Sequence, residues 1–124
     1  MKRWAFLLCF AVVSCGWSRQ DLVLEGAWQV LHVIDYGQTL DIAKHPKQYH
    51  ECNPLLDEHP SEGDVNLFAV VAGILHPVIT GALPPKAEIF GIEFSPRTVW
   101  QAYSLGEKAG CVINNFSIGL CINY

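Results

Sequence analysis

Four polar residues near the middle of the sequence have side chains and a spacing that could support chemistry. Asp35 and Thr39 are one helical turn apart, so a helix would place them on the same face, and Glu51 and Asn53 follow in the next loop. Polar groups at membrane depth normally face the helix bundle and pair with one another. This polar cluster therefore either lines a binding site or fixes the register of the helices, and we favour the structural role.

The same loop carries a group of side chains of the types that ligate metals. Their spacing matches neither a C-x-x-C pair nor an H-E-x-x-H helix. Two of the histidines directly precede prolines, which is typical of an extended, solvated loop. We therefore predict no metal site, and nothing else in the sequence indicates a cofactor. The residues considered are His45, His50, Glu51, Cys52 and His59.

Nucleophilic catalysis has little support in the sequence. There is no G-x-S-x-G elbow around a serine and no glycine-rich phosphate loop. Glu107 is either a proton carrier or a partner for Lys108 or His76, and the partner role is favoured. The sequence thus predicts a non-enzymatic protein, and the alternative is an intramembrane enzyme or a metal-binding protein.

The composition is that of an apolar chain with few charges. Hydrophobic residues make up 51% of its 124 residues and charged residues 16%, whereas ordinary soluble domains carry about 25% charged residues. This balance favours a membrane protein or an unusually apolar small bundle. The formal net charge of −4 argues against nucleic acid as a partner, because the chain could not neutralise a run of phosphates. The length allows one domain.

The first residues have the layout of a secretory signal. Lys2 and Arg3 form a positive region, and residues 4–13 form an apolar stretch that is too short for a stable membrane span. Residues 12–15 (VVSC) resemble a lipobox, which predicts lipidation of Cys15. The alternatives are ordinary cleavage near residue 15 and an uncleaved N-terminal anchor. We therefore expect a signal peptide over residues 1–15 and export to a bacterial cell envelope.

The first helix is expected over residues 21–43. Its polar residues recur every three or four positions and gather within about a third of the circumference. Such a helix suits a bilayer, with the polar face turned to other helices, or a soluble bundle, with that face turned to water. Asp35 makes solitary membrane insertion cost about 2.5–3.5 kcal/mol. The polar face of this helix comprises Asp21, Glu25, Gln29, His32, Asp35 and Thr39.

Two further helices are expected. Residues 65–83 are the clearest membrane span, because they carry no Asp, Glu, Lys or Arg, and Pro77 inside them is tolerated better in a bilayer than in water. The alternative is a buried core helix. A third helix, apolar but interrupted by Gln101, Glu107 and Lys108, is expected over residues 98–113. Residues 88–94 alternate and suit either a short strand or an interfacial segment, and residues 116–124 form a short, apolar, β-like tail.

Several motifs resemble those of a group of short uncharacterised membrane proteins of Gram-negative bacteria and their phages. The resemblance covers about residues 30–120 and implies a helical membrane protein, without implying an activity. Cys52 and an apparent insertion at residues 87–96 depart from the pattern. The motifs are DYGQT at 35–39, ECNPLL with HP at 51–60, ALPP at 82–85, WQ at 100–101 with Gly106 and Ala109, and NFSIG at 115–119.

The sequence therefore predicts an all-α fold, in which a signal peptide precedes a single membrane domain over residues 20–124. This domain is a small three-helix bundle with an irregular C-terminal tail. The predicted function is that of a small envelope protein, favoured in the inner membrane, that acts through other membrane components or envelope proteins. The main alternative is a soluble periplasmic helical lipoprotein tethered by Cys15.

Overall fold

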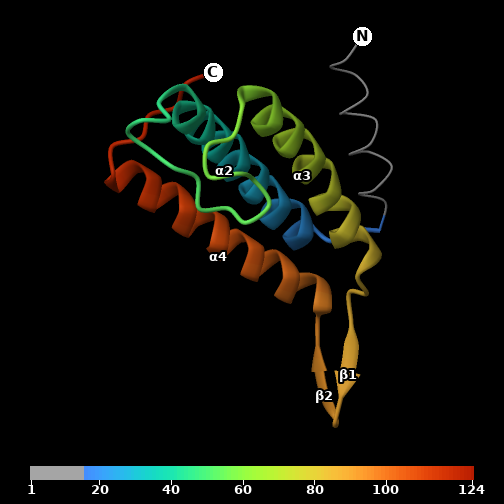
Figure 1. Ribbon diagram of the computed structural model, residues 1–124. Helices are drawn as coiled ribbons and strands as arrows, with labels where there is room; N and C mark the ends of the chain where they lie inside the picture. The colour runs from blue at the N-terminus through green and yellow to red at the C-terminus, as the bar shows by residue number, and fades with distance from the viewer. Residues whose placement is uncertain (1–15) are drawn as a thin grey trace.

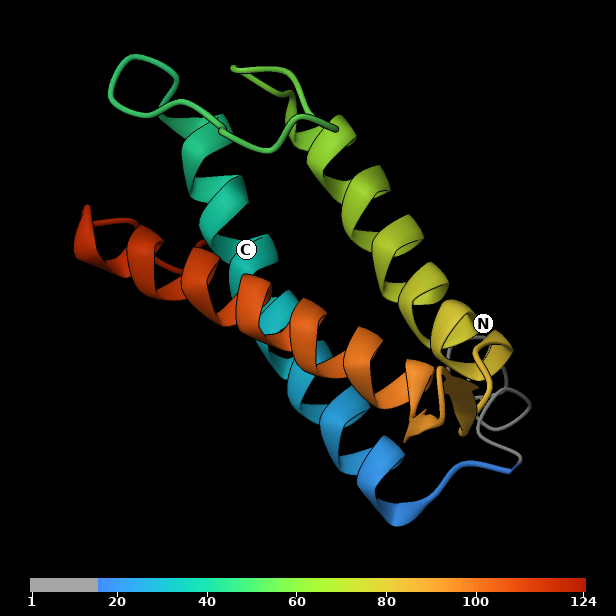
Figure 2. The ribbon, with the colours of Figure 1, turned by 90° about the horizontal axis from the view of Figure 1, so that it is seen from below.

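The computed structural model describes residues 16–124, so the predicted signal peptide and Cys15 lie outside the described residues. In this part of the chain three helices pack side by side, α2 (Arg19–Lys44), α3 (Glu62–Ala82) and α4 (Pro96–Ser117). Helices α3 and α4 converge beside a two-stranded hairpin and diverge toward the loop over residues 45–61 (Figures 1 and 2). The predominantly helical architecture agrees with the prediction.

Each helix begins at a side-chain cap. The hydroxyl of Ser18 accepts from the backbone N–H of Asp21, whose carboxylate accepts in return from the Ser18 N–H, so α2 begins before the predicted residue 21. Ser61 and Asp64 form the same capping box at the start of α3. Ser95 caps α4, in which Pro96 occupies the first turn. Serine caps therefore set all three described starts.

The chain between α3 and α4 corrects the all-α prediction. Strand β1 (Ala87–Ile89) pairs in antiparallel fashion with β2 (Ile92–Phe94), with Glu88 opposite Glu93. The turn contains Phe90 and Gly91, both at positive φ, which glycine adopts without strain. Of the two possibilities for this segment, a strand pair has formed, and it projects beyond the helices (Figure 1).

The C-terminal tail is irregular, as predicted, but it contains no strand, and α4 extends beyond residue 113 to Ser117. The tail packs against α2. Backbone N–H groups of Asn123 and Cys121 donate to the Gly37 carbonyl and the Asp41 carboxylate, at 3.1 and 3.0 Å. A Cβ at Gly37 would lie 2.7 Å from Ile122, so only glycine permits this approach.

The last residue also fastens the tail. The Tyr124 hydroxyl donates to the Val33 carbonyl at 2.6 Å. Burial, with a smaller contribution from Tyr36, raises the pKa of the Tyr124 phenol. The phenol therefore stays protonated and able to donate this hydrogen bond well into the alkaline range.

Apolar and polar side chains are distributed in the reverse of the usual order. Among the described residues, ten polar or charged side chains are buried against six large apolar ones, while apolar side chains cover the outside of each helix. Val30 on α2 is 62% exposed, Leu67 on α3 66% and Ile113 on α4 68%. Helix α3 is, among the described helices, the one long and apolar enough to cross a membrane by composition, with a mean hydropathy of 1.8.

Candidate functional site

The polar face of α2 is turned toward α3 and α4 rather than toward solvent. Asp21, Glu25, His32 and Thr39 on this face are buried. The structure therefore has the polar face of this helix directed inward. The inward side chains meet partners at successive heights along the bundle, and these polar layers form its interior.

The first layer lies nearest the hairpin and joins all three helices. Arg97 at the start of α4 donates to the carboxylate of Asp21 on α2 at 3.2 Å, and both side chains are buried. The same guanidinium donates to the Leu83 and Gly81 carbonyls at 3.2 and 3.5 Å, which satisfies two of the carbonyls at the C-terminal end of α3. Gln101 donates to the Asp21 carbonyl at 2.9 Å.

The second layer contains a linear arrangement of Glu25, His76 and Ser104, one residue from each helix. Nδ1 of His76 lies 2.8 and 3.0 Å from the two carboxylate oxygens of Glu25, and Nε2 lies 2.7 Å from Oγ of Ser104. The Thr80 hydroxyl lies 3.2 Å from the Glu25 carboxylate and 2.9 Å from the His76 carbonyl, so these two acceptors share its proton. Because a carboxylate can only accept, the proton on this side of the ring belongs to Nδ1. The Ser104 hydroxyl lies 2.7 Å from Nε2 and 3.2 Å from the Gln101 carbonyl, and its single proton can be donated to one of these two acceptors at a time.

Aromatic stacking holds the His76 ring in this orientation. The ring of Trp28 stacks on it with centroids 3.7 Å apart and planes 8° apart, and Trp100 lies with its centroid 5.3 Å away. The indole N–H of Trp100 is buried without a hydrogen-bond partner in the described structure. The layer thus contains a fixed imidazole beside an unused donor.

A third layer compensates for a proline inside α3. Pro77 has no N–H, so it cannot donate to the Gly73 carbonyl four residues before it. Gln29 on α2 donates to this carbonyl at 3.1 Å, and its amide also donates to Glu25 at 2.9 Å. His32 donates from Nε2 to the neighbouring Ala69 carbonyl at 2.9 Å. Side chains of the polar face thus replace the missing backbone bond.

The fourth layer brings the predicted polar cluster together. Asp35, Thr39, Glu51 and Asn53 all line one cavity of about 420 Å³ between the three helices and the loop. Asp35 accepts from Lys108 at 2.7 Å and from Asn115 at 3.3 Å.

The two loop members of the cluster also shape their own backbone. The Glu51 carboxylate accepts from the N–H groups of Cys52 and Asn53, at 2.9 and 2.8 Å, and Asn53 accepts from the Leu55 N–H at 3.0 Å. These bonds are internal to the loop and fix its backbone conformation beside the cavity.

The metal-ligand types in the loop separate in the structure. His50, Glu51 and Cys52 line the cavity, whereas His45 pairs with Asp41 at 3.1 Å and His59 is exposed. Within residues 16–124 no three His, Cys, Asp or Glu side chains are placed to hold a metal ion.

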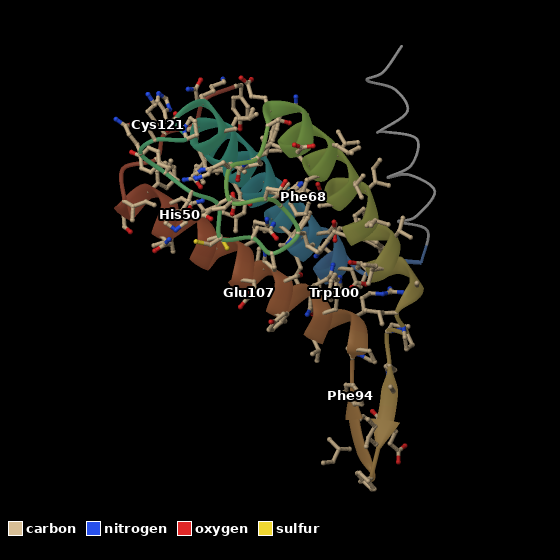
Figure 3. The ribbon with its side chains drawn as sticks, viewed as in Figure 1. His50, Phe68, Phe94, Trp100, Glu107 and Cys121 are labelled. Carbon is tan, nitrogen blue, oxygen red and sulfur yellow. The ribbon has the colours of Figure 1, made fainter. Side chains whose placement is uncertain are left out.

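Glu107 has neither of the partners expected from the sequence. It is exposed and lines the cavity, while Lys108 pairs with Asp35 and His76 pairs with Glu25. Figure 3 shows Glu107 on the part of α4 nearer to the loop that carries His50, and Trp100 nearer to the hairpin.

Sequence reasoning missed the arrangement of Glu25, His76 and Ser104. Two signals were present: Glu25 belongs to the polar face of α2, and His76 is the one ionisable residue in the apolar stretch 65–83, where such a residue suggests a functional site. Ser104 carries no sequence signal, because one serine on a mixed helix looks like any other.

Comparison with known proteins assigns no relative. No protein-family model matches this chain, and no curated protein and no solved structure matches it. The resemblance to a group of short membrane proteins therefore stays a prediction.

Proposed function

We propose that this chain is a small integral protein of the bacterial cell envelope, favoured in the inner membrane, whose three helices all lie in the bilayer. The observation that carries the proposal is the orientation of α2, whose apolar residues Val23, Val30 and Val33 face outward while its polar face is buried. A soluble bundle would orient these two faces the other way. Lipid accounts for the exposed apolar surface on all three helices.

Pairing inside the bundle lowers the free-energy cost of placing the charged side chains of α2 in the bilayer, which α2 could not enter alone. Asp21, Glu25 and Asp35 are each joined to a basic or imidazole side chain on another helix. Charged groups within membranes normally face the bundle and are paired in this way. The proposed role is interaction with other membrane components through the apolar outer surface. The tethered soluble lipoprotein leaves that surface without an explanation.

Arginine substitutions at outward-facing positions test the placement, in a Cys15→Ala background that removes any lipid tether. Val30→Arg on α2 and Leu75→Arg on α3 each add a charge at lipid depth, which costs about 2.5–3.5 kcal/mol. Both should reduce the fraction that resists alkaline carbonate extraction. Leu55→Arg is the matched control, because Leu55 is 77% exposed in the loop. The proposal would be contradicted if Val30→Arg and Leu75→Arg left the same carbonate-resistant fraction as Leu55→Arg and made the protein more soluble.

A specific observation favours an enzyme as a second candidate function. The hydrogen-bonded series from Glu25 through His76 to Ser104 has the order of roles of a hydrolytic triad, in which a carboxylate orients an imidazole that contacts a hydroxyl. The alternative function as an intramembrane enzyme therefore has a definite candidate site.

A further inference from the structure

We propose that Ser104 is the nucleophile of a serine hydrolase site in which His76 is the general base and Glu25 the positioning residue. The substrates assigned to this site are acyl esters of membrane lipids. The assignment of lipid rests on the proposed membrane placement, whereas the site itself rests on geometry alone. The contact that begins the argument is the 2.7 Å separation of Nε2 of His76 and Oγ of Ser104.

The base is oriented from its far side. Glu25 is fully buried and contacts Nδ1 of His76 with both carboxylate oxygens, at 2.8 and 3.0 Å. Gln29 donates to the same carboxylate at 2.9 Å, and the Thr80 hydroxyl lies 3.2 Å from the carboxylate and 2.9 Å from the His76 carbonyl. The contact with Glu25 places a proton on Nδ1, so Nε2 of the neutral ring is bare, and this is the form of the ring that removes a proton from a hydroxyl.

A donor for the developing oxyanion lies in the same layer. Trp100 precedes Ser104 by four residues, so both lie on one face of α4. Its indole N–H has no partner in the described structure, although it is buried and its ring lies beside His76. A buried donor without a partner is costly. A carbonyl oxygen at Ser104 would provide the missing acceptor, and we assign Trp100 this stabilising role.

The surroundings of Ser104 indicate the substrate class. Ser104 is partly exposed, unlike Glu25 and His76. Val99 and Tyr103 on the same helix are 58% and 65% exposed, so a substrate that approaches along this part of α4 meets an apolar surface. In a bilayer that surface faces lipid, and the acyl ester is the lipid group that a serine nucleophile attacks.

The position along the bundle agrees with this class. With a rise of about 1.5 Å per residue, Glu25 and His76 lie about 9 Å, and Ser104 about 12 Å, from the helix ends beside the hairpin. The three residues thus lie at similar distances from the ends of their helices. Figure 1 shows that these helix ends lie at the hairpin side of the bundle. This end of the bundle, rather than its centre, is closer to the lipid ester groups.

The reaction is ester hydrolysis in two steps. Oγ of Ser104 bonds to the ester carbonyl carbon as the carbon–oxygen bond to the alcohol breaks, and Nε2 of His76 passes the Ser104 proton to the leaving alcohol. Water then bonds to the acyl carbon as the bond from this carbon to Oγ breaks, and His76 takes a proton from the water and returns it to Oγ. The products are a carboxylic acid, an alcohol and regenerated Ser104.

Fluorophosphonate labelling of the purified full chain in detergent micelles tests the nucleophile. We expect the parent to be labelled, and the labelling signal of Ser104→Ala to be at least about tenfold lower than that of the parent. Ser117→Ala is the matched control, because Ser117 also donates to the carbonyl three residues before it on α4 but is exposed in the last turn. Labelling of parent and Ser104→Ala to the same extent, in chains that unfold at the same temperature, would overturn the proposal.

Ester cleavage tests the roles of the other residues. Hydrolysis of p-nitrophenyl butyrate by the parent should fall about 10²- to 10⁴-fold in Glu25→Gln, because the amide can donate to Nδ1 and leave Nε2 protonated. The pH–rate profile of this variant should change shape, which a purely structural role of Glu25 would not cause. An unchanged rate and profile would overturn the assignment of Glu25.

Fatty-acid release from phosphatidylglycerol vesicles tests the lipid substrate. Release that requires Ser104 supports it, and cleavage of the soluble ester without release from vesicles overturns it. An unlabelled chain that stays in the carbonate-resistant membrane fraction refutes the hydrolase and leaves the proposed placement standing. A labelled chain that fractionates as soluble refutes the placement and the lipid assignment together, and leaves the nucleophile standing.

Discussion

Lys108 on α4 places its ammonium nitrogen 2.7 Å from the carboxylate of Asp35 on α2, and both side chains are largely buried. The pair lies on the wall of the cavity and is the fourth of the polar layers that join α2 to its neighbours. Substitution of Asp35 is therefore the most direct test of whether the polar cluster stabilises the bundle.

Replacing Asp35 by leucine makes α2 more apolar, so hydropathy alone predicts better insertion. We expect Asp35→Leu to insert as well as the parent but to lose about 1–3 kcal/mol of stability, because Lys108 is left buried without its partner. The measurements are thermal unfolding and proteolysis in detergent. Asp35→Asn should be milder, since the amide oxygen still accepts a hydrogen bond.

A double variant separates loss of the pair from loss of the aspartate. Adding Lys108→Met to Asp35→Leu should recover part of the lost stability, because no unpaired charge remains. Wild-type stability of both Asp35 variants, accompanied by loss of a cellular phenotype, would instead make Asp35 a functional residue.

Substitution of Gly37 should destabilise the protein, because the C-terminal tail packs directly against this residue. A Cβ there would lie 2.7 Å from Ile122 and 2.9 Å from Tyr124, so Gly37→Ala should displace the tail and cost about 1–3 kcal/mol. Thermal unfolding and the rate of alkylation of Cys121 measure the two effects. Gly26→Ala on the same helix meets nothing within 4 Å and should be neutral or slightly stabilising. Equal effects at the two positions would contradict the tail contact.

Gln29 and Pro77 should be energetically coupled through the Gly73 carbonyl. Gln29→Leu removes the donor that replaces the missing Pro77 N–H, and we expect a loss of about 0.5–2 kcal/mol. In a Pro77→Ala background the loss should be smaller, because the alanine N–H can donate to Gly73 itself. Thermal unfolding of the four proteins gives the coupling, and additive effects would argue against this compensation.

The N-terminal prediction is tested on the mature chain. Mass spectrometry of membrane-extracted protein should find an N-terminus at Cys15 or within a few residues of it, and lipidation would add the mass of acyl chains that Cys15→Ala removes. Intact Met1 on most of the protein would instead identify an N-terminal anchor.

Local signals made much of the helical architecture predictable. The spacing of Asp21, Glu25 and His32 indicated one polar face, and the apolar run over residues 65–83 indicated a second helix, which the structure has as Glu62–Ala82. Helix α4 was expected to end at residue 113, two residues before Asn115. The Asn115 side chain instead donates across the bundle to Asp35 and Gln38, and the helix continues.

The chemistry of the candidate site was less predictable than its elements. The loop and helix positions of Asp35, Thr39, Glu51 and Asn53 suggested their proximity, and the structure places all four around one cavity. The series through Glu25, His76 and Ser104 depends on three helices and on contacts 51 and 28 residues apart. Spacing within one helix contains no information on such contacts, so only the packed bundle reveals them.

The polar layers also set an order of events during synthesis, given the proposed membrane placement. Lys108 follows Asp35 by 73 residues, so at about 5–20 residues per second it is made roughly 4–15 s later. During that interval α2 has left the ribosome with its carboxylates unpaired, and α3 supplies only His76 as a partner. Helix α2 must therefore wait at the insertion machinery or the membrane surface, and it enters the bilayer together with α4 rather than before it.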